Sequence, residues 1–178
     1  MYGVFLAKFR KEARLMKYFW RYSSPLGEIF MQIDGENLSV LKFGKFSEFG
    51  AEFREQNLQI FGDTRAWLDI YFSGNLPNFI PKISLIGSDF QLEIWRILMQ
   101  IPFGTTTTYG EIARKIALKR QIPKMSARAV GRAVGANPIA IIIPCHRVIG
   151  SGDKLTGYAY GLDKKEFLLN LENAKFRA

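Results

Sequence analysis

The chain has very few of the residues that cross-link proteins or bind transition metals. Its 178 residues include one cysteine and one histidine. A single cysteine excludes an intrachain disulfide and favours a reducing compartment, so we expect a cytoplasmic protein. The same scarcity excludes a cysteine-based zinc site within one chain, and we expect no metal. Apolar runs are too short to span a bilayer, so we also expect no membrane association.

Acidic residues are absent from one long stretch. The net charge is +9, and between Ile112 and Gly152 there is no Asp or Glu. The basic residues of that stretch are Arg114, Lys115, Lys119, Arg120, Lys124, Arg128, Arg132 and Arg147. A field of one sign attracts polyanions, with nucleic acid as the leading candidate. A solvated basic surface is the alternative, and charge alone does not separate the two.

The first half predicts strands followed by a helix. Aromatic or alternating patterns predict strands at 17–22, 28–34 and 38–43, with a hairpin turn at Asp34-Gly35. Asp63 and Thr64 are candidate caps of a helix that ends at 73–75. We expect a small N-terminal domain, residues 1–76, with an antiparallel sheet and a helix. Residues 77–87, with their prolines, are the expected linker.

The second half, residues 88–178, predicts a mostly helical domain, which makes the fold class α/β of the α+β kind. Ser88, Thr108 and Ser126 each precede a helical pattern, at 90–100, 109–117 and 127–136. Thr108 and Glu111 have the spacing of a capping box. The second and third of these helices, joined by a short basic connection, indicate a helix-turn-helix. A last helix is expected at about 162–173.

The third of these helices has an unusual face. Ala127 and Gly131 lie one turn apart, as do Arg128 and Arg132. Small residues beside arginine allow the backbone to approach a flat surface closely, which suits a DNA groove, the minor groove above all. A tight helix–helix contact through the small residues is the alternative.

Cysteine and histidine are neighbours in Pro144-Cys145-His146-Arg147-Val148. A thiolate is the reactive form of cysteine, and a nearby imidazole or cation favours it. Two other interpretations remain: an inert buried cysteine that packs as a small hydrophobe, and a cysteine hydrolase. Hydrolases of that kind usually bring their histidine from a distant segment, which weighs against the second.

This segment resembles the active-site sequence Pro-Cys-His-Arg-Val of the O6-alkylguanine-DNA alkyltransferases. The resemblance extends over about residues 88–173 and includes Trp95, 101–104, 108–113, 127–131, 136–138, Gly157-Tyr158, Gly161-Leu162, Lys165-Glu166, Leu168-Leu169 and Glu172. In the first half, only 24–27 is similar. The family implies a DNA repair protein that moves an alkyl group from guanine O6 to its own cysteine, once and without a cofactor, with O4-alkylthymine as a further candidate substrate.

The resemblance assigns roles in the transfer to five residues. Cys145 is the nucleophile, and His146 acts on it through a bridging water while Glu172 orients the imidazole. A water suits the local geometry, because neighbours on an extended segment point to opposite sides. Tyr109 donates a proton to the departing guanine. Asn137 matches a structural hinge, although an ordinary polar helix stop before Pro138 fits nearly as well.

The resemblance also implies the partner, double-stranded DNA with alkylated bases, bound by a monomer that would be nucleoid-associated in a prokaryote. Arg128 matches the finger that enters the stack when the base is flipped out. The implied DNA contacts are Arg128, Ala127, Ala129, Gly131, Arg132, Tyr109, Gly110 and Ser151. The implied pocket residues are Tyr109, Val148, Tyr158, Ala159 and Tyr160.

Ala159 and Tyr160 depart from the commoner serine and small residue, so the preference among alkyl groups stays open. A DNA-damage binding module without transfer activity is the runner-up function. Relatives of that kind lack the cysteine, and the presence of Cys145 argues against it.

Overall fold

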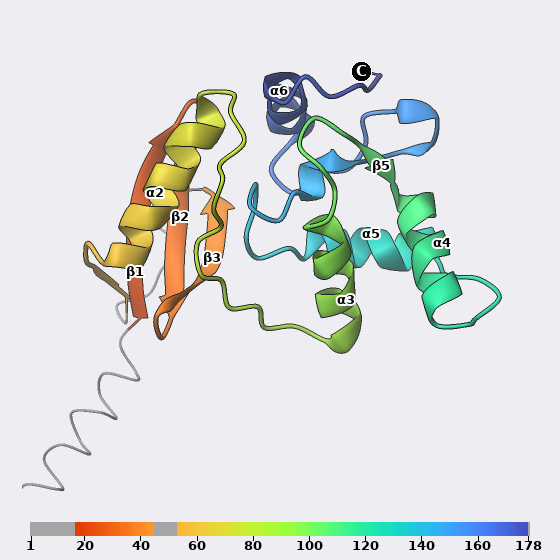
Figure 1. Ribbon diagram of the computed structural model, residues 1–178, viewed down its shortest axis with the longest axis horizontal. Helices are drawn as coiled ribbons and strands as arrows, with labels where there is room; N and C mark the ends of the chain where they lie inside the picture. The colour runs from red at the N-terminus through yellow and green to blue at the C-terminus, as the bar shows by residue number, and fades with distance from the viewer. Residues whose placement is uncertain (1–16, 45–52, 178) are drawn as a thin grey trace, which may run out of the picture. The chain divides into compact units, whose positions relative to one another are not determined.

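The computed structural model describes residues 17–44 and 53–177. Strands β1 (Lys17–Ser24), β2 (Gly27–Asp34), β3 (Asn37–Phe43) and β4 (Phe53–Glu55) precede helix α2 (Gln59–Phe72) (Figure 1). Then come α3 (Asp89–Leu98), β5 (Thr107–Thr108), α4 (Tyr109–Lys119), α5 (Ala127–Gly135), the 3-10 turn η2 (Cys145–Arg147), β6 (Val148–Ile149), the 3-10 turn η3 (Ser151–Asp153) and α6 (Leu162–Leu171). This content confirms the predicted α+β class. Among the described residues, no helix has the length and hydropathy to cross a membrane.

The chain divides into two compact units. One contains the described residues up to Asp69 together with Asn78–Ser84, and the other contains Ile70–Pro77 and Leu85 onwards. The end of α2 therefore clusters with the C-terminal unit, while part of the expected linker clusters with the N-terminal one. The domain limits expected from sequence, at 76 and 88, stay a prediction.

The sheet of the N-terminal unit is mixed. Its strand order is β3-β2-β1-β4, and the β1–β2 and β2–β3 pairs are antiparallel as the hairpin pattern predicts. The short strand β4 was not predicted and pairs in parallel with β1. Consecutive residues Ile29, Phe30 and Met31 of β2 are all buried, so the central strand is covered on both faces.

Helix α2 begins at Gln59, so the predicted cap at Asp63 and Thr64 is wrong. Both side chains bond back to the preceding turn instead. Gln59 Nε2 donates to Asp63 Oδ1 at 2.7 Å, and Thr64 Oγ1 donates to the Ile60 carbonyl at 2.7 Å. These bonds satisfy inside the helix the same polar groups that would cap a helix start.

The three predicted helix starts in the C-terminal unit are confirmed. The side chains of Ser88, Thr108 and Ser126 accept from backbone N–H groups three residues on, at Gln91, Glu111 and Ala129. The first two form complete capping boxes. Local capping chemistry therefore fixes where α3, α4 and α5 begin.

Candidate active site

Cys145 opens the 3-10 turn η2 inside a continuously buried run from Ile139 to Ile149. The expected extended segment is therefore wrong, because the Arg147 amide donates to the Pro144 carbonyl at 3.0 Å and closes a turn. Successive side chains on a 3-10 turn also point in different directions. The hydrogen bonds of the described residues include none between the Cys145 and His146 side chains.

Asn137 links the end of α5 to the cysteine. Its Nδ2 donates to Cys145 Sγ at 3.2 Å and to the Ile143 carbonyl at 2.7 Å, and its Oδ1 accepts from the Ile139 amide at 3.0 Å. Burial raises the pKa of the Cys145 thiol, whereas the Asn137 bond and the Lys165 charge lower it. The amide thus stabilises negative charge on sulfur in a site that otherwise opposes it.

Lys165 on α6 is a fully buried cation with a role that sequence reasoning missed. Its Nζ donates to the carbonyls of Val148, Thr156 and Gly157 at 2.6, 2.5 and 3.1 Å. Burial lowers the Lys165 pKa to about 8. Through these hydrogen bonds the ammonium connects α6 to residues 148–157, which follow the cysteine in sequence. The resemblance includes this residue, but nothing local predicts that a lysine faces inward.

The buried carboxylate of Glu172, at the C-terminal end of α6, accepts hydrogen bonds from four residues in three segments. Glu172 Oε1 lies 2.7 Å from His146 Nε2, 2.7 Å from the Tyr71 hydroxyl and 3.0 Å from a terminal nitrogen of Arg147. Glu172 Oε2 accepts from Arg147 Nε at 2.8 Å and from the Gly104 amide at 3.2 Å. The structure therefore brings the predicted pair His146 and Glu172 together, along with Arg147 and Tyr71, which sequence reasoning missed.

These contacts determine the charges of the pair. Burial alone would raise the pKa of Glu172, but His146 and Arg147 bring it down to about 2. Burial lowers the pKa of His146, with Glu172 opposing the shift. The stable state at neutral pH is an ionised carboxylate beside a neutral imidazole. Since a carboxylate only accepts, we assign the imidazole proton to Nε2. His146 Nδ1 is buried and has no partner among the described residues.

A cavity of about 180 Å³ opens onto the sulfur. Its lining residues are Tyr109, Gly131, Val134, Gly135, Asn137, Cys145, Gly157, Tyr158 and Ala159. Three predicted pocket residues thus line the cavity. The other two, Val148 and Tyr160, are not in this lining: Val148 is buried in β6, and Tyr160 packs edge-on against Tyr158 with ring centroids 5.4 Å apart.

Two tyrosines and a glycine shape the cavity wall. The Tyr109 hydroxyl donates to the Gly157 carbonyl at 3.3 Å, and burial raises the Tyr109 pKa, so the phenol is protonated at neutral pH. Gly157 has φ 52°, and a Cβ there would lie 3.2 Å from the Tyr109 hydroxyl. A side chain at 157 would therefore be strained and crowded against this group. The Tyr158 hydroxyl is buried without a partner among the described residues.

Helix α5 has a buried apolar side and an exposed basic side. Val130, Ala133 and Val134 are buried, and the indole of Trp95 donates to the Ala133 carbonyl at 2.9 Å. The predicted DNA-contact residues have a different environment: Ala127, Arg128 and Arg132 are exposed, Ala129 and Gly131 are half-buried, and Gly110 and Ser151 are exposed. The close contact between α5 and α3 is therefore made at Ala133. Ala127 and the two arginines are exposed and could contact a binding partner.

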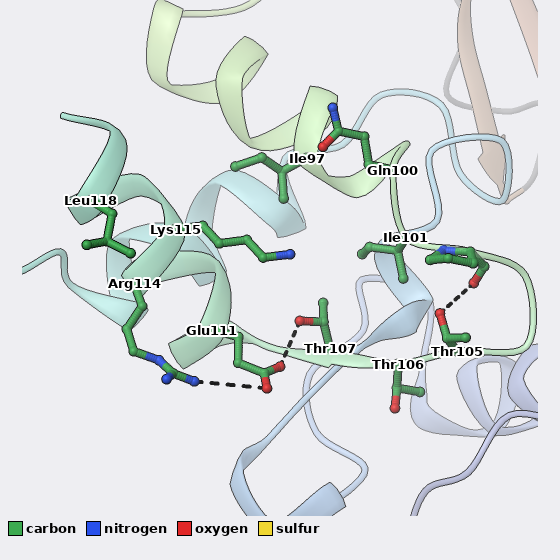
Figure 2. A pocket seen from close by; sticks show the side chains of 11 residues that line it. Ile97, Gln100, Ile101, Thr105, Thr106, Thr107, Glu111, Arg114, Lys115 and Leu118 are labelled. Carbon is green, nitrogen blue, oxygen red and sulfur yellow. Dashed lines mark hydrogen bonds and ion pairs between the residues drawn. The ribbon is translucent and has the colours of Figure 1, made fainter.

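The C-terminal unit has a larger hollow of about 530 Å³ away from the cysteine, between the end of α3 and α4 (Figure 2). Glu111, one of the lining residues, accepts from the Thr107 hydroxyl at 2.8 Å and lies 4.0 Å from the Arg114 guanidinium. Glu111 is therefore already paired within the hollow. We place the chemistry in the smaller cavity, because that one contains the thiol.

Comparison with known proteins gives a consistent set of relatives. The family model described as "6-O-methylguanine DNA methyltransferase, DNA binding domain" matches residues 89–174. The chain is similar to a methylated-DNA–protein-cysteine methyltransferase of Methanosarcina acetivorans, with 46% identity over 88% of this chain and 99% of that protein. One of Haemophilus influenzae is 39% identical over 89% and 88%. A crystal structure of Mycobacterium tuberculosis OGT in complex with DNA has a TM-score of 0.76 and 39% identity, covering 88% of this chain and 92% of that one.

Proposed function

The chain belongs to the family of methylated-DNA–protein-cysteine methyltransferases, and on that premise we propose how this DNA repair protein works. It takes an alkyl group from O6 of guanine in duplex DNA onto Cys145 Sγ, with the damaged base flipped out of the helix. Each molecule acts once. Cys145 is the chain's single cysteine, so no second thiol is present to take the alkyl group from the thioether.

The observation that carries this proposal is the buried thiol at the base of a small cavity. Pockets for drug-sized ligands are roughly 300–1,000 Å³, so a cavity of about 180 Å³ suits a smaller planar group. A guanine inside duplex DNA cannot reach a recessed sulfur without leaving the stack. Gly131, Gly135, Gly157 and Ala159 have little or no side chain, so their part of the lining leaves room for a flat base.

The transfer step follows from the protonation states. Cys145 gives its proton through a bridging water to His146 Nδ1, the ring nitrogen that has no hydrogen-bond partner among the described residues. Sγ attacks the alkyl carbon, and the carbon–O6 bond breaks. Guanine leaves with the bonding electrons and takes a proton from the Tyr109 hydroxyl. The phenolate then regains a proton from solvent, and His146 releases the one that it gained.

The DNA interface that we propose is the exposed face of α5. Arg132 and its basic neighbours bind phosphates without reading sequence, which suits a protein that searches for lesions. Arg128, the second residue of α5, is exposed and projects where a groove-binding helix meets the stack. Gly110 in α4 and Ser151 in η3, also exposed, extend the proposed contact beyond α5.

Mass spectrometry of the intact protein tests the transfer. After mixing with a duplex that contains O6-methylguanine, we expect a mass increase of one methyl group, located on Cys145 by peptide mapping. Cys145→Ser supplies the control and should bind the duplex without gaining mass. An unmodified Cys145, or repeated turnover by one molecule, would contradict the proposal.

A further inference from the structure

Tyr71 reaches the candidate active site from outside the segment that the family model matches. It lies one residue before the end of α2, whereas the match covers residues 89–174. Residues 70–77 nevertheless cluster with the unit that contains Cys145, and the Tyr71 side chain is fully buried there. The mechanism proposed above does not use this residue.

The Tyr71 hydroxyl lies where the carboxylate and the imidazole meet. It donates to Glu172 Oε1 at 2.7 Å and is 3.4 Å from His146 Nε2. Burial, followed by the Glu172 charge, raises the Tyr71 pKa well above its ordinary value, so the group acts as a donor. The rings of Tyr71 and His146 meet nearly edge-on, with an interplanar angle of 73°.

This arrangement limits the position of the imidazole. Both acceptors beside Nε2, the Glu172 carboxylate and the Tyr71 oxygen, favour a proton on that nitrogen. A ring rotated by half a turn would lose the 2.7 Å bond to Glu172. Outer partners of a functional histidine commonly fix its tautomer and ring orientation in this way.

We infer that Tyr71 is a positioning residue for His146: its hydroxyl fixes the Glu172 oxygen that receives Nε2–H and so keeps Nδ1 free to accept the Cys145 proton. The inference rests on the proposed function for the direction in which that proton moves. Tyr71 itself neither gains nor loses a proton and forms no bond to substrate.

Tyr71→Phe tests the inference, since it keeps the ring and removes the hydroxyl. With the duplex at saturating concentration, we expect the transfer rate to fall about tenfold, the effect of losing one hydrogen bond to a charged group. Duplex affinity should not change. Tyr22→Phe is the matched control, because the Tyr22 hydroxyl also donates to a carboxylate, Asp69 Oδ1 at 2.8 Å, within the N-terminal unit.

The single histidine supplies a readout that packing alone would not move. In protein labelled with 15N-histidine, one imidazole is observed, and its nitrogen shifts report the tautomer. We expect protonated Nε2 and unprotonated Nδ1 in the wild type at neutral pH. In Tyr71→Phe we expect the two shifts to move toward each other, as for a ring that samples both tautomers.

Three results would overturn the inference. One is a wild-type rate in Tyr71→Phe. Another is a lower rate with an unchanged imidazole spectrum, which would assign Tyr71 to packing alone. The third is an Nδ1-protonated ring in the wild type, a measurement that stands even if Tyr71→Phe does not fold. Failure of the proposed function gives a different result, the absence of an alkyl adduct on wild-type Cys145.

Discussion

Asn137 connects the C-terminal end of α5, the helix proposed to contact DNA, to the sulfur of Cys145. One amide group donates both to Cys145 Sγ and to the Ile143 carbonyl, and it is buried. These bonds are the contacts by which Asn137 could act as the structural hinge that the family resemblance implies. They join the residue that follows the C-cap of α5 to the segment that bears the nucleophile.

Asn137→Ala should weaken both connections. Without the amide, the pKa of the Cys145 thiol rises further, and the thiolate fraction at neutral pH falls. We expect the reaction of Cys145 with iodoacetamide to slow about tenfold at neutral pH and its midpoint to move to higher pH. The Ile139 amide, which donates to Asn137 Oδ1 in the wild type, loses its acceptor, and this should cost about 1–3 kcal/mol of stability.

The single cysteine makes the iodoacetamide measurement specific to the site. Asn170→Ala, a change of an exposed asparagine on α6, is the control and should keep the wild-type profile. A wild-type midpoint in Asn137→Ala would show that the amide does not act on the sulfur.

At the scale of the element, α5 carries two arginines with different proposed tasks. Arg128 lies at the start of the helix and Arg132 one turn later, and both are exposed. The finger acts after binding, when the base leaves the stack, whereas a phosphate contact acts on binding itself.

Arg128→Ala should therefore lower the transfer rate at saturating duplex far more than the rate with the free base O6-methylguanine, which needs no flipping. Arg132→Ala should weaken duplex binding and reduce the slope of log K against log salt by about one, while the rate at saturation stays near wild type. Equal losses on duplex and free base in Arg128→Ala would remove its role in flipping.

The elements that could be predicted from the sequence are those whose ends are determined by residues close in sequence. Ser88, Thr108 and Ser126 bind amides three residues on, so their sequence pattern contains most of the information. Strands β4, β5 and β6 are two or three residues long and exist through distant partners, which local propensity does not report. The η2 turn is likewise held within a buried run, where an apolar pattern does not distinguish extended from 3-10 backbone.

The candidate site divides in the same way. Cys145 and His146 followed from a specific motif, and Glu172 followed from the family resemblance. Tyr71 looked like one more core residue of an amphipathic helix, because the helical period that buries Trp67 and Leu68 also buries its ring. Only the tertiary structure shows that its hydroxyl meets a carboxylate 101 positions away.

At the scale of the whole molecule, the buried pair should make stability depend on pH. In the folded protein the His146 pKa lies below its ordinary 6.5, and the Glu172 pKa is about 2 against an ordinary 4.5. Both shifts mean that the unfolded chain binds more protons in acid. Stability should therefore fall as pH drops through about 6.5, and again from about 4.5 toward 2.

Urea denaturation followed by tryptophan fluorescence, at neutral pH, near pH 5.5 and near pH 3, measures this dependence. Glu172→Gln should lose the lower step. Glu36→Gln, at the exposed turn between β2 and β3, should retain the wild-type curve. A free energy of unfolding that stays constant or rises on acidification would contradict the prediction.

The convergence of three segments on Glu172 also has a consequence for the order of events during folding. Tyr71 and Arg147 are separated from Glu172 by 101 and 25 positions, so the cluster closes only when long loops have been closed. Contacts of such wide sequence separation form late and slowly, whereas the locally capped helices form early. We therefore expect a newly made chain to form its capped helices before the His146–Glu172 pair, so that Cys145 becomes reactive only in the fully folded molecule.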